Sequence, residues 1–492
     1  MNVLRTAFVA TGLILFLAAM AQPITRTEVE GLTVISAKTA NERLMAEVNK
    51  AGDIVKGIQA FEAHLHGLGY PLMRVTDYDL SEDGVLRAKI AEGRINFVEV
   101  VGNRRTRSDT LYYLAGLTPG EVYYAPKVEA ARRRLGRLGY LNDVKIGPVT
   151  DDESKLGSVT ARIEVEEGRS QQVGLALGYT QEAGLVGFVS AQDLNFAGLG
   201  HRARLAWQRD SFRDITTGQV FEGRSSYFAS YQADRVMGSP FGIGVQGYDR
   251  TGQFYPTFST IETNLRRFEH RSGAGFWLGY EFTESMGLRA LFRSDQVDFD
   301  DAPNHLIGPS GKAANRGKVQ TIGGELIWDT REKLNFPRTG FYFSFTAENA
   351  VAPSDFRFNR FVADFRYFMP VKDNSSLAFR AMAGVAGANA PLSEQFWIGG
   401  YDSLRGYAQD EFFGQRMAVV SAEFRFPVWE DIQASFFIDQ GLAWNPGSRP
   451  TFSNLKTGVG VGLHFASPIG PIKLEFAVGR KGHTYLSLGA SY

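Results

Sequence analysis

The sequence contains no cysteine among its 492 residues. A chain without thiols can form neither a disulfide framework nor a cysteine-based metal site, so both are excluded. It also lacks an excess of one charge. Lysine plus arginine and aspartate plus glutamate number 53 each, which argues against nucleic acid as a partner. Beyond the first residues no run of about 18 apolar residues occurs, which excludes transmembrane helices there.

The N-terminus has the pattern of a secretory signal peptide. Arg5 gives a positive start, Ala7–Ala19 form an apolar run, and Ala19-Met20-Ala21 matches the small-residue cleavage pattern. Residues 1–21 are therefore predicted to be a signal peptide, with the mature chain beginning at Gln22. A membrane anchor is the alternative, but the run is shorter than the roughly 20 residues that span a bilayer.

Glycine and aromatic residues are abundant, at 54 glycines and 13% aromatic side chains. Both suit a large antiparallel barrel, in which glycine relieves tight corners and aromatics lie at the membrane interfaces. From residue 170 to 492, short segments of alternating hydrophobicity are separated by turn residues. We predict a transmembrane antiparallel β-barrel of sixteen strands, an even number as in single-chain bacterial barrels, at 171–180, 185–194, 201–210, 223–233, 240–252, 266–281, 284–298, 317–329, 338–350, 358–371, 374–386, 415–428, 431–443, 454–466, 470–479 and 482–492.

Alternation within these strands predicts which face meets lipid. In the strand at 431–443, Phe436 and Ile438 share one face, while Ser435 and Asp439 share the other. An apolar face turned outward and a polar face turned to a lumen are typical of a transmembrane barrel. A soluble sandwich is the alternative, and it would turn its apolar face inward.

The part of the chain before the barrel contains a weak internal repeat. Leu68-Gly69-Tyr70 recurs as Leu138-Gly139-Tyr140, and Glu92-Gly93-Arg94 recurs as Glu167-Gly168-Arg169. Two α+β units, 22–93 and 94–169, are therefore predicted, each with the order strand, helix, helix, strand, strand. An amphipathic helix precedes each Leu-Gly-Tyr, whose glycine suits a helix C-terminus. The predicted strands are Leu32–Ser36, Leu72–Asp77 and Gly84–Ala91, then Ile95–Val101, Asp143–Val149 and Ser158–Val165.

Five motifs follow one another along the barrel: QDLNFAGLG at 192–200, WDTR through PRTG at 328–340, IGGYDSLRGY at 398–407, AEFRFP at 422–427 and FIDQG at 437–441. They resemble the ordered motifs of the BamA-type assembly superfamily, which also includes the two-partner secretion transporters. The two repeated units resemble POTRA domains, the periplasmic modules of that family. The resemblance implies a barrel in the bacterial outer membrane, with the POTRA units in the periplasm.

The motif at 398–407 contains one arginine, Arg405, followed by Gly406 and Tyr407. An arginine inside a barrel lumen would be an unpaired charge in a confined space and would need carboxylates. Glu423 and Asp439 point inward on adjacent strands by the alternation, and a guanidinium can bond both in a planar fork. We predict that these residues pin the loop inside the barrel, with Gly406 permitting the tight backbone. A solvated extracellular arginine is the alternative.

The first and last barrel strands must meet at a seam. Gly174 and Gly178 lie on the first strand, and Gly482 and Gly489 lie on the last, which ends on the terminal aromatic Tyr492. Glycines reduce side-chain packing, so this seam is predicted to open more easily than other strand pairs. A terminal aromatic at the end of an alternating strand also resembles the C-terminal signal of outer-membrane barrels.

The resemblance implies an outer-membrane protein assembly factor. The POTRA units would capture unfolded outer-membrane or secreted polypeptides, and the seam would accept client strands beside outer-membrane lipid. Accessory lipoproteins are further candidate partners. No enzyme activity, cofactor or metal is expected. His64 and His66, two residues apart on a helix, do not share a face.

Two other functions are alternatives to this one. A two-partner secretion transporter would thread a dedicated exoprotein through the pore, and two POTRA units fit that class. The class usually carries a plug helix and a Pro-rich linker first, for which few residues are available between Gln22 and the first strand. A passive porin would need neither a pinned loop nor POTRA units.

Overall fold

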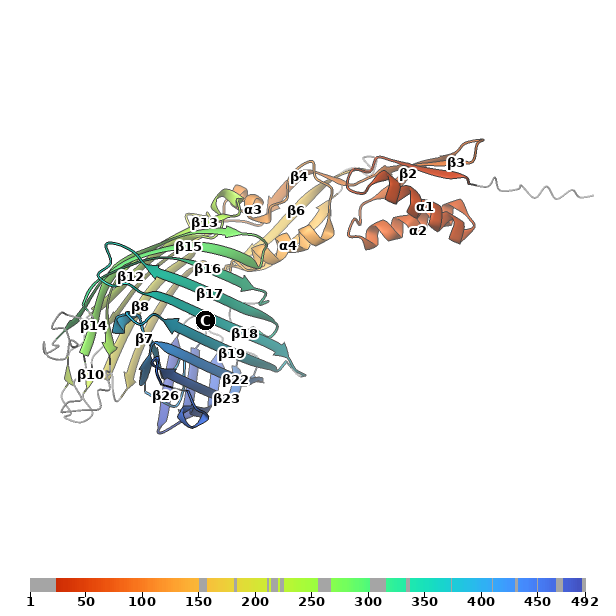
Figure 1. The fold of residues 1–492 in the computed structure, drawn as a ribbon. Helices are drawn as coiled ribbons and strands as arrows, with labels where there is room; N and C mark the ends of the chain where they lie inside the picture. The colour runs from red at the N-terminus through yellow and green to blue at the C-terminus, as the bar shows by residue number, and fades with distance from the viewer. Residues whose placement is uncertain are drawn as a thin grey trace, which may run out of the picture. The chain divides into compact units, whose positions relative to one another are not determined.

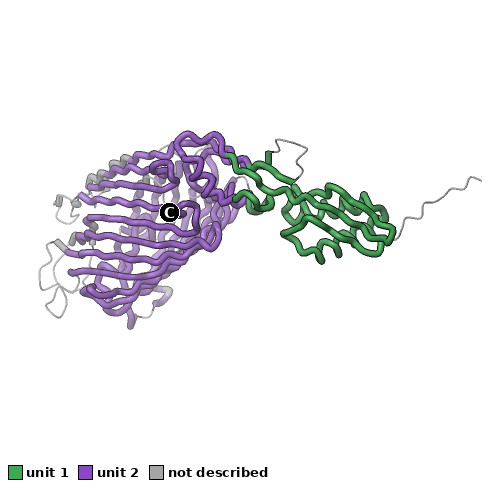
Figure 2. Tube along the Cα trace, turned by 90° about the horizontal axis from the view of Figure 1, so that it is seen from above, with its two compact units in different colours: residues 1–99, 118–128, 147–161 green, residues 100–117, 129–146, 162–492 purple. Residues whose placement is uncertain are grey.

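The computed structural model describes residues 24–149, 157–180, 184–209, 212–213, 220–221, 225–254, 267–300, 316–332, 337–372, 374–408, 410–429, 432–448, 450–465 and 472–488. The predicted signal peptide lies outside the described residues, as do Gly489 and Tyr492. The chain divides into two compact units, coloured separately in Figure 2. The first unit comprises residues 1–99, 118–128 and 147–161, and the second comprises 100–117, 129–146 and 162–492.

The first unit contains a three-stranded sheet of order β1-β3-β2. β1 (Arg26–Glu30) pairs parallel with β3 (Val85–Ala91), whose other side pairs antiparallel with β2 (Arg74–Leu80). Helices α1 (Ala37–Ala51) and α2 (Ile54–Gly67) contribute apolar faces to the same core. The amphipathic helix predicted before Leu-Gly-Tyr is α2.

The predicted strand at Leu32–Ser36 is wrong, because the first strand is β1. Gly31 adopts a φ of 89°, which ends β1. The next residues form the approach to α1, where Ser36 caps the helix by accepting a hydrogen bond from the backbone N–H of Thr39. The β-branched residues of this segment therefore lie in a helix-entry loop rather than a strand.

The second repeat contains β4 (Arg94–Val101), α3 (Ser108–Ala115), α4 (Ala125–Gly136), β5 (Leu141–Val149) and β6 (Ser158–Glu167). The strands form a sheet of order β4-β6-β5. All five elements match the predicted order strand, helix, helix, strand, strand. The division between the two compact units runs through this repeat.

The remainder of the chain forms a sixteen-stranded antiparallel sheet (Figure 1), which confirms the predicted number of strands. Its strands are β7 (Gln171–Thr180), β8 (Gly184–Phe196), β9 (His201–Arg209), β12 (Ser225–Ala233), β13 (Phe241–Phe254), β14 (Arg267–Glu281), β15 (Met286–Asp300), β16 (Gly317–Asp329), β17 (Gly340–Ala350), β18 (Asn359–Pro370), β19 (Ser376–Ala386), β22 (Arg416–Trp429), β23 (Ile432–Trp444), β24 (Lys456–Phe465), β25 (Ile472–Val478) and β26 (Gly482–Leu488).

Each strand of this sheet pairs with its neighbour in the chain, from β7 at one end to β26 at the other. Short strands β10 (Phe212–Arg213) and β11 (Val220–Phe221) pair with each other separately. Among the described residues, β26 and β7 are not paired with each other in register. Within the described ranges, β7 is therefore paired in register only with β8, and β26 only with β25.

The two faces of the sheet have opposite chemistry. On β23, Phe436 and Ile438 are exposed, whereas Ser435 and Asp439 are buried on the other face. Exposed apolar side chains on the outside and buried polar ones inside are the arrangement expected of a sheet surrounded by lipid. No helix within the described ranges is both long and apolar enough to cross a membrane.

The connection between β19 and β22, residues 387–415, has its own structure, and we call it the inner loop. It contains the 3-10 helix η3 (Leu392–Glu394) and a small hairpin of β20 (Phe396–Ile398) and β21 (Phe412–Gly414). The rings of Trp397 and Phe413 stack across this hairpin, with centroids 4.6 Å apart. The inner loop carries the motif at 398–407.

Candidate functional site

Arg405 of the inner loop binds the inner face of the sheet and is only 8% exposed. Its Nε and Nη2 donate to the two carboxylate oxygens of Asp439, at 2.8 and 2.9 Å, and its backbone N–H donates to the same carboxylate at 3.1 Å. Its Nη1 donates to Glu423 Oε2 at 3.3 Å. The structure thus brings together Arg405, Glu423 and Asp439, the three charged residues predicted to pin the loop. Asp439 is the carboxylate that binds the guanidinium in a bidentate way.

The sequence reasoning missed a third carboxylate, that of Glu475 on β25. It accepts a hydrogen bond from Arg405 Nη1 at 2.8 Å, shorter than the contact to Glu423. Alternation within β25 indicates that Glu475 faces inward, but not that it lies at the height of Arg405. A second arginine, Arg425, donates to the other oxygen of Glu423 at 2.8 Å. The cluster therefore holds three buried carboxylates against two guanidinium groups, and the buried ring of His464 lies 3.5 Å from Glu475 and 3.9 Å from Glu423.

An aromatic ring completes the contacts of Arg405. The guanidinium carbon lies 3.4 Å from the ring centroid of Phe437, which is itself buried. A guanidinium on an aromatic face keeps its in-plane N–H groups free for carboxylates. Phe437 lies on the same face of β23 as Ser435 and Asp439, and this contact explains an aromatic side chain on the inner face.

The two residues after Arg405 are also fixed. Gly406 has a φ of 94°, and a Cβ there would lie 2.6 Å from the backbone nitrogen of Gly479, so only glycine fits. Tyr407 is buried, and its hydroxyl donates to the backbone carbonyl of Thr457 at 3.1 Å. Both predicted positions therefore lie against the sheet beside Arg405.

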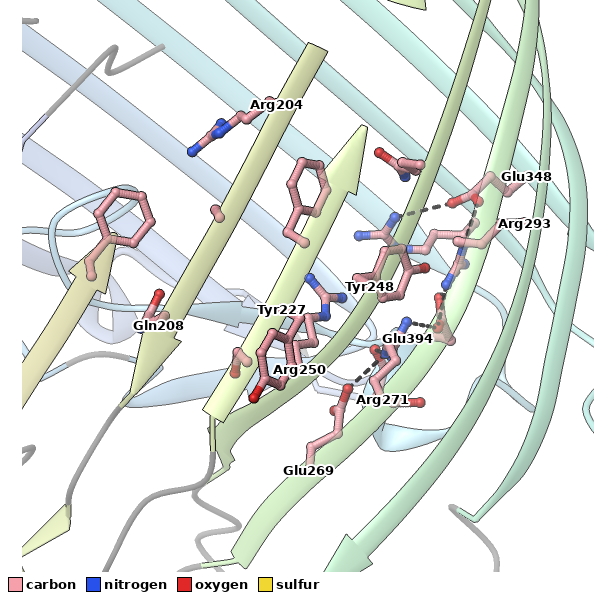
Figure 3. Close-up of a pocket in the computed structure, with 17 residues that line it drawn as sticks. Arg204, Gln208, Tyr227, Tyr248, Arg250, Glu269, Arg271, Arg293, Glu348 and Glu394 are labelled. Atoms are coloured by element: carbon pink, nitrogen blue, oxygen red, sulfur yellow. Dashed lines mark hydrogen bonds and ion pairs between the residues drawn. The ribbon is translucent and has the colours of Figure 1, made fainter. Parts of the chain in front are cut away.

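A second charge cluster holds the other end of the inner loop (Figure 3), and no sequence signal had indicated it. Glu394 of η3 is 3% exposed and accepts hydrogen bonds from Arg271 of β14 at 2.9 Å and from Arg293 of β15 at 2.9 and 3.1 Å. Asp295 lies between the same two arginines, at 3.1 and 2.6 Å. The loop is therefore tied to β14 and β15 as well as to β22, β23 and β25.

Between these two charge clusters the loop packs through apolar side chains. Phe396, Ile398 and Leu404 are almost fully buried. They belong to one hydrophobic cluster with residues of the inner sheet face, including Val297 and Val419. Burial of this kind is worth about 1.5–3 kcal/mol for each large apolar side chain. The inner loop is thus packed into the sheet by charge pairs at two places and by a core between them.

A cavity of about 610 Å³ remains beside the second charge cluster. Its walls come from η3 and from strands β8, β9, β12, β13, β14, β15, β17 and β18, and Figure 3 shows charged residues that line it. Arg204 and Arg250, on β9 and β13, stack their guanidinium groups over Phe228 and Tyr248, with the guanidinium carbons 5.7 and 5.1 Å from the ring centroids. This part of the inner face is polar and is not filled by the loop.

The predicted seam residues fall partly within the described chain. A Cβ on Gly174 would lie 2.7 Å from Ser190 Oγ, and one on Gly482 would lie 3.2 Å from the ring of Phe476. Both glycines therefore face neighbours in their own hairpins. Gly178 lies on β7, whose side chains are not described at that point.

The Glu-Gly-Arg repeat has a common structural role in the two copies. Glu92 accepts hydrogen bonds from the backbone N–H and the hydroxyl of Thr33, and Glu167 accepts from the backbone N–H groups of Arg105 and Thr106. Each carboxylate thus binds the loop that enters the first helix of its repeat. Burial raises the pKa of Glu92 and Glu167, but these hydrogen bonds outweigh it and leave both pKa values below the ordinary 4.5.

Comparison with known proteins identifies the family. A family model described as the Omp85 superfamily domain matches residues 195–487, more than half of the chain. A POTRA model, described as a surface antigen variable number repeat, matches residues 93–168. The chain is 24% identical over 409 residues to the outer membrane protein assembly factor BamA of Nitratidesulfovibrio vulgaris, which covers 78% of this chain and 48% of the relative. It spans about half the length of the bacterial relatives that it matches.

Solved structures share the fold. CdiB from Escherichia coli superposes with a TM-score of 0.67 at 15% identity, covering 99% of this chain and 91% of that one. BamA from Haemophilus ducreyi lacking POTRA domains 1–3 gives 0.53 at 17% identity, covering 94% and 98%. The family model over more than half of the chain shows that the chain belongs to the Omp85 superfamily, as an outer-membrane β-barrel protein with its POTRA repeat in the periplasm, and the sixteen-stranded sheet agrees with it.

Proposed function

We propose that this chain is an outer-membrane protein assembly factor that inserts client β-strands at the seam between β7 and β26. In this proposal residues 1–21 are a signal peptide, 22–93 and 94–169 are POTRA domains, and 170–492 form the barrel. Clients are unfolded outer-membrane or secreted polypeptides. Outer-membrane lipid meets the apolar outer face, and accessory lipoproteins are further candidate partners.

The anchored inner loop is the observation that carries this proposal. A client threaded through the lumen would have to displace a loop held by Arg405 at one place and by Glu394 at another. Breaking a buried ion pair by removing one partner costs about 3–5 kcal/mol, and here two clusters would have to open. Strand addition at the ends of the sheet leaves both intact, so lateral insertion is favoured over passage through the lumen.

Capture by the POTRA repeats would use the outer strands of their sheets. In the orders β1-β3-β2 and β4-β6-β5, the outer strands are β1 and β2 in one sheet and β4 and β5 in the other. An outer strand can pair with an extended polypeptide by β-augmentation, which needs backbone hydrogen bonds and little sequence specificity. Such pairing suits a protein that serves unfolded clients.

A cross-link across the seam tests the proposed function. Cysteines introduced singly on β7, at 171–174, and on β26, at 483–486, would be combined pairwise, and the native chain has no cysteine to interfere. The pair that forms a disulfide should abolish insertion of a β-barrel client into proteoliposomes, and reduction should restore it. Full insertion by the oxidised protein would refute a seam mechanism.

A second candidate function is secretion of a dedicated polypeptide through the lumen, favoured by the structural likeness to CdiB. It needs the inner loop to leave, so fixing the loop distinguishes the two functions. A Cβ on Gly441 would lie 3.3 Å from Ile398 Cδ1, so cysteines at these positions suit a short thiol cross-linker. Cross-linking should leave seam insertion intact, whereas it should block transport through the lumen.

A further inference from the structure

The last strand, β26, touches the inner loop directly. The hydroxyl of Tyr485 accepts a hydrogen bond from the backbone N–H of Gly406 at 3.0 Å and donates one to the backbone carbonyl of Tyr407 at 2.8 Å. One phenol thus binds two consecutive residues of the loop, immediately after Arg405. Its neighbours on β26 face the other way, and Leu486 is exposed on the outside.

The strand beside β26 contacts the same point of the loop. In the register of β25 and β26, Tyr485 is opposite Glu475, the carboxylate that binds Arg405 at 2.8 Å. This cross-strand pair therefore holds the consecutive residues Arg405 and Gly406. The contact to β26 is not an isolated hydrogen bond but the continuation of the arginine cluster into the terminal hairpin.

Glycines bring the loop backbone against the backbone of these strands. A Cβ on Gly458 of β24 would lie 1.8 Å from the carbonyl oxygen of Arg405. A Cβ on Gly479, in the turn between β25 and β26, would lie 2.5 Å from the carbonyl oxygen of Gly406. We call Gly458, Gly479 and Tyr485 the loop cradle.

From this geometry we propose that Tyr485 is a positioning residue that couples the inner loop to the seam strand, so that the docked loop holds β26 in place. The inference rests on the proposed function, but its test measures the coupling directly and needs no client. β26 is paired in register only with β25 among the described residues, and the loop is its second attachment. If β26 moved alone, the buried N–H of Gly406 and the carbonyl of Tyr407 would lose the hydroxyl that they share as a hydrogen-bond partner.

In this proposal the inner loop acts on β26, and this affects insertion at the seam. With the loop docked, Tyr485 holds β26 in place and the seam resists opening. When β26 moves to accept a client strand, both hydrogen bonds of Tyr485 must break, because the Arg405 cluster keeps residues 405–407 on the sheet. The loop therefore acts on the seam from inside the sheet, without contact to the client.

Hydrogen exchange of the full-length protein in lipid nanodiscs, without client, tests this coupling. Tyr485→Phe keeps the ring and removes both hydrogen bonds, so the backbone amides of β26 should exchange about tenfold faster, as expected for two lost hydrogen bonds. Amides of β23 should be unchanged. Tyr367→Phe is the matched control, because Tyr367 is 41% exposed on the outer face of β18. Equal exchange of β26 in both variants would overturn the coupling.

A second variant approaches the same contact from the loop side. Gly458→Ala should push the loop off the cradle, since its Cβ would overlap the Arg405 carbonyl, and should raise exchange in residues 405–407 and in β26 together. Gly247→Ala on β13, whose Cβ would meet nothing closer than 4.0 Å, is its control. Faster exchange of the loop with an unchanged β26 would show that the two are independent. Seam insertion assays report separately on the proposed function, so either idea can fail alone.

Discussion

Replacing Arg405 by alanine tests the physical basis of the anchored loop. Among the residues that the structure describes, Arg405 alone brings a guanidinium to Asp439, and the change also removes a cation from Glu423 and Glu475. Glu423 keeps Arg425 as a partner. Asp439, at 1% exposure, is left buried without a cation bound to it. The perturbation is therefore larger than the loss of one surface ion pair.

The magnitude follows from burial. An exposed ion pair contributes at most about 1 kcal/mol, whereas removing one partner of a buried pair costs about 3–5 kcal/mol, because the remaining charge stays desolvated. The stacking of Arg405 on Phe437 adds a contact that alanine also loses. We expect the free energy of unfolding to fall by about 3–5 kcal/mol, or the loop to leave the sheet so that its carboxylates become hydrated. Arg405→Lys keeps the charge but not the fork, and should lie between alanine and wild type.

Two measurements on the full-length protein separate these outcomes. Denaturant unfolding in lipid reports the loss of stability, and hydrogen exchange of residues 398–407 reports departure of the loop. Arg289→Ala serves as the control, because Arg289 also lies over an aromatic ring, 4.3 Å from the Trp277 centroid, but is about one-third exposed and has long carboxylate contacts, at 3.4 and 3.8 Å. It should change the free energy of unfolding by no more than about 1 kcal/mol.

A charge-compensating variant tests the electrostatic explanation of the Arg405→Ala effect. If Arg405→Ala is harmful because carboxylates remain unpaired, adding Glu475→Gln should recover part of the loss, since it removes one buried charge. In the wild-type background the same Glu475→Gln change should destabilise. Additive losses in the double variant would refute the electrostatic explanation, and an Arg405→Ala protein as stable as wild type would refute the anchor itself.

Three further predictions concern other parts of the chain. Glu394→Gln should leave Arg271 and Arg293 with fewer carboxylates and loosen η3, seen as faster exchange of residues 390–398 with residues 405–407 unchanged. Because the folded-state pKa of Glu92 lies below the ordinary 4.5, its stabilisation is present above that pH and is lost as the pH falls through the lowered value. Glu92→Gln should therefore flatten the acid dependence of α1 protection below pH 4.5, and an unchanged profile would contradict the assignment. Lys145→Pro on the outer strand β5 should reduce client assembly without reducing the amount of protein in the outer membrane, and normal assembly would identify β5 as a structural strand only.

The sheet was predictable from the sequence because its signals are local. Alternation of period two and turn residues between strands are properties of neighbouring residues, and they located all sixteen strands within a few residues. Alternation also placed Glu423 and Asp439 on the inner face, where the structure has them bound to Arg405. A charge in a confined space needs opposite charges, so the type of partner followed from chemistry alone.

The error at Leu32–Ser36 shows where local signals fail. A run of apolar and β-branched residues favours a strand, but the carboxylate of Glu92, at the end of β3, binds the backbone of Thr33 and Val34 and fixes the segment as a loop before α1. That hydrogen bond joins residues about sixty positions apart in the sequence. The competing interaction was therefore invisible to any window of neighbouring residues.

Local sequence signals also predicted only part of the site, and the tertiary structure alone decided the rest. Sequence alternation assigns a residue to a face, but it does not say which inward residues of distant strands lie at the same height. Glu475 meets Arg405 across 70 residues, Tyr485 meets Gly406 across 79, and Glu394 meets Arg271 across 123. These contacts depend on strand register accumulated around the sheet and on the path of the inner loop. The sequence therefore determined which residues carry charge into the lumen, and the fold decided which of them hold the loop and connect it to the last strand.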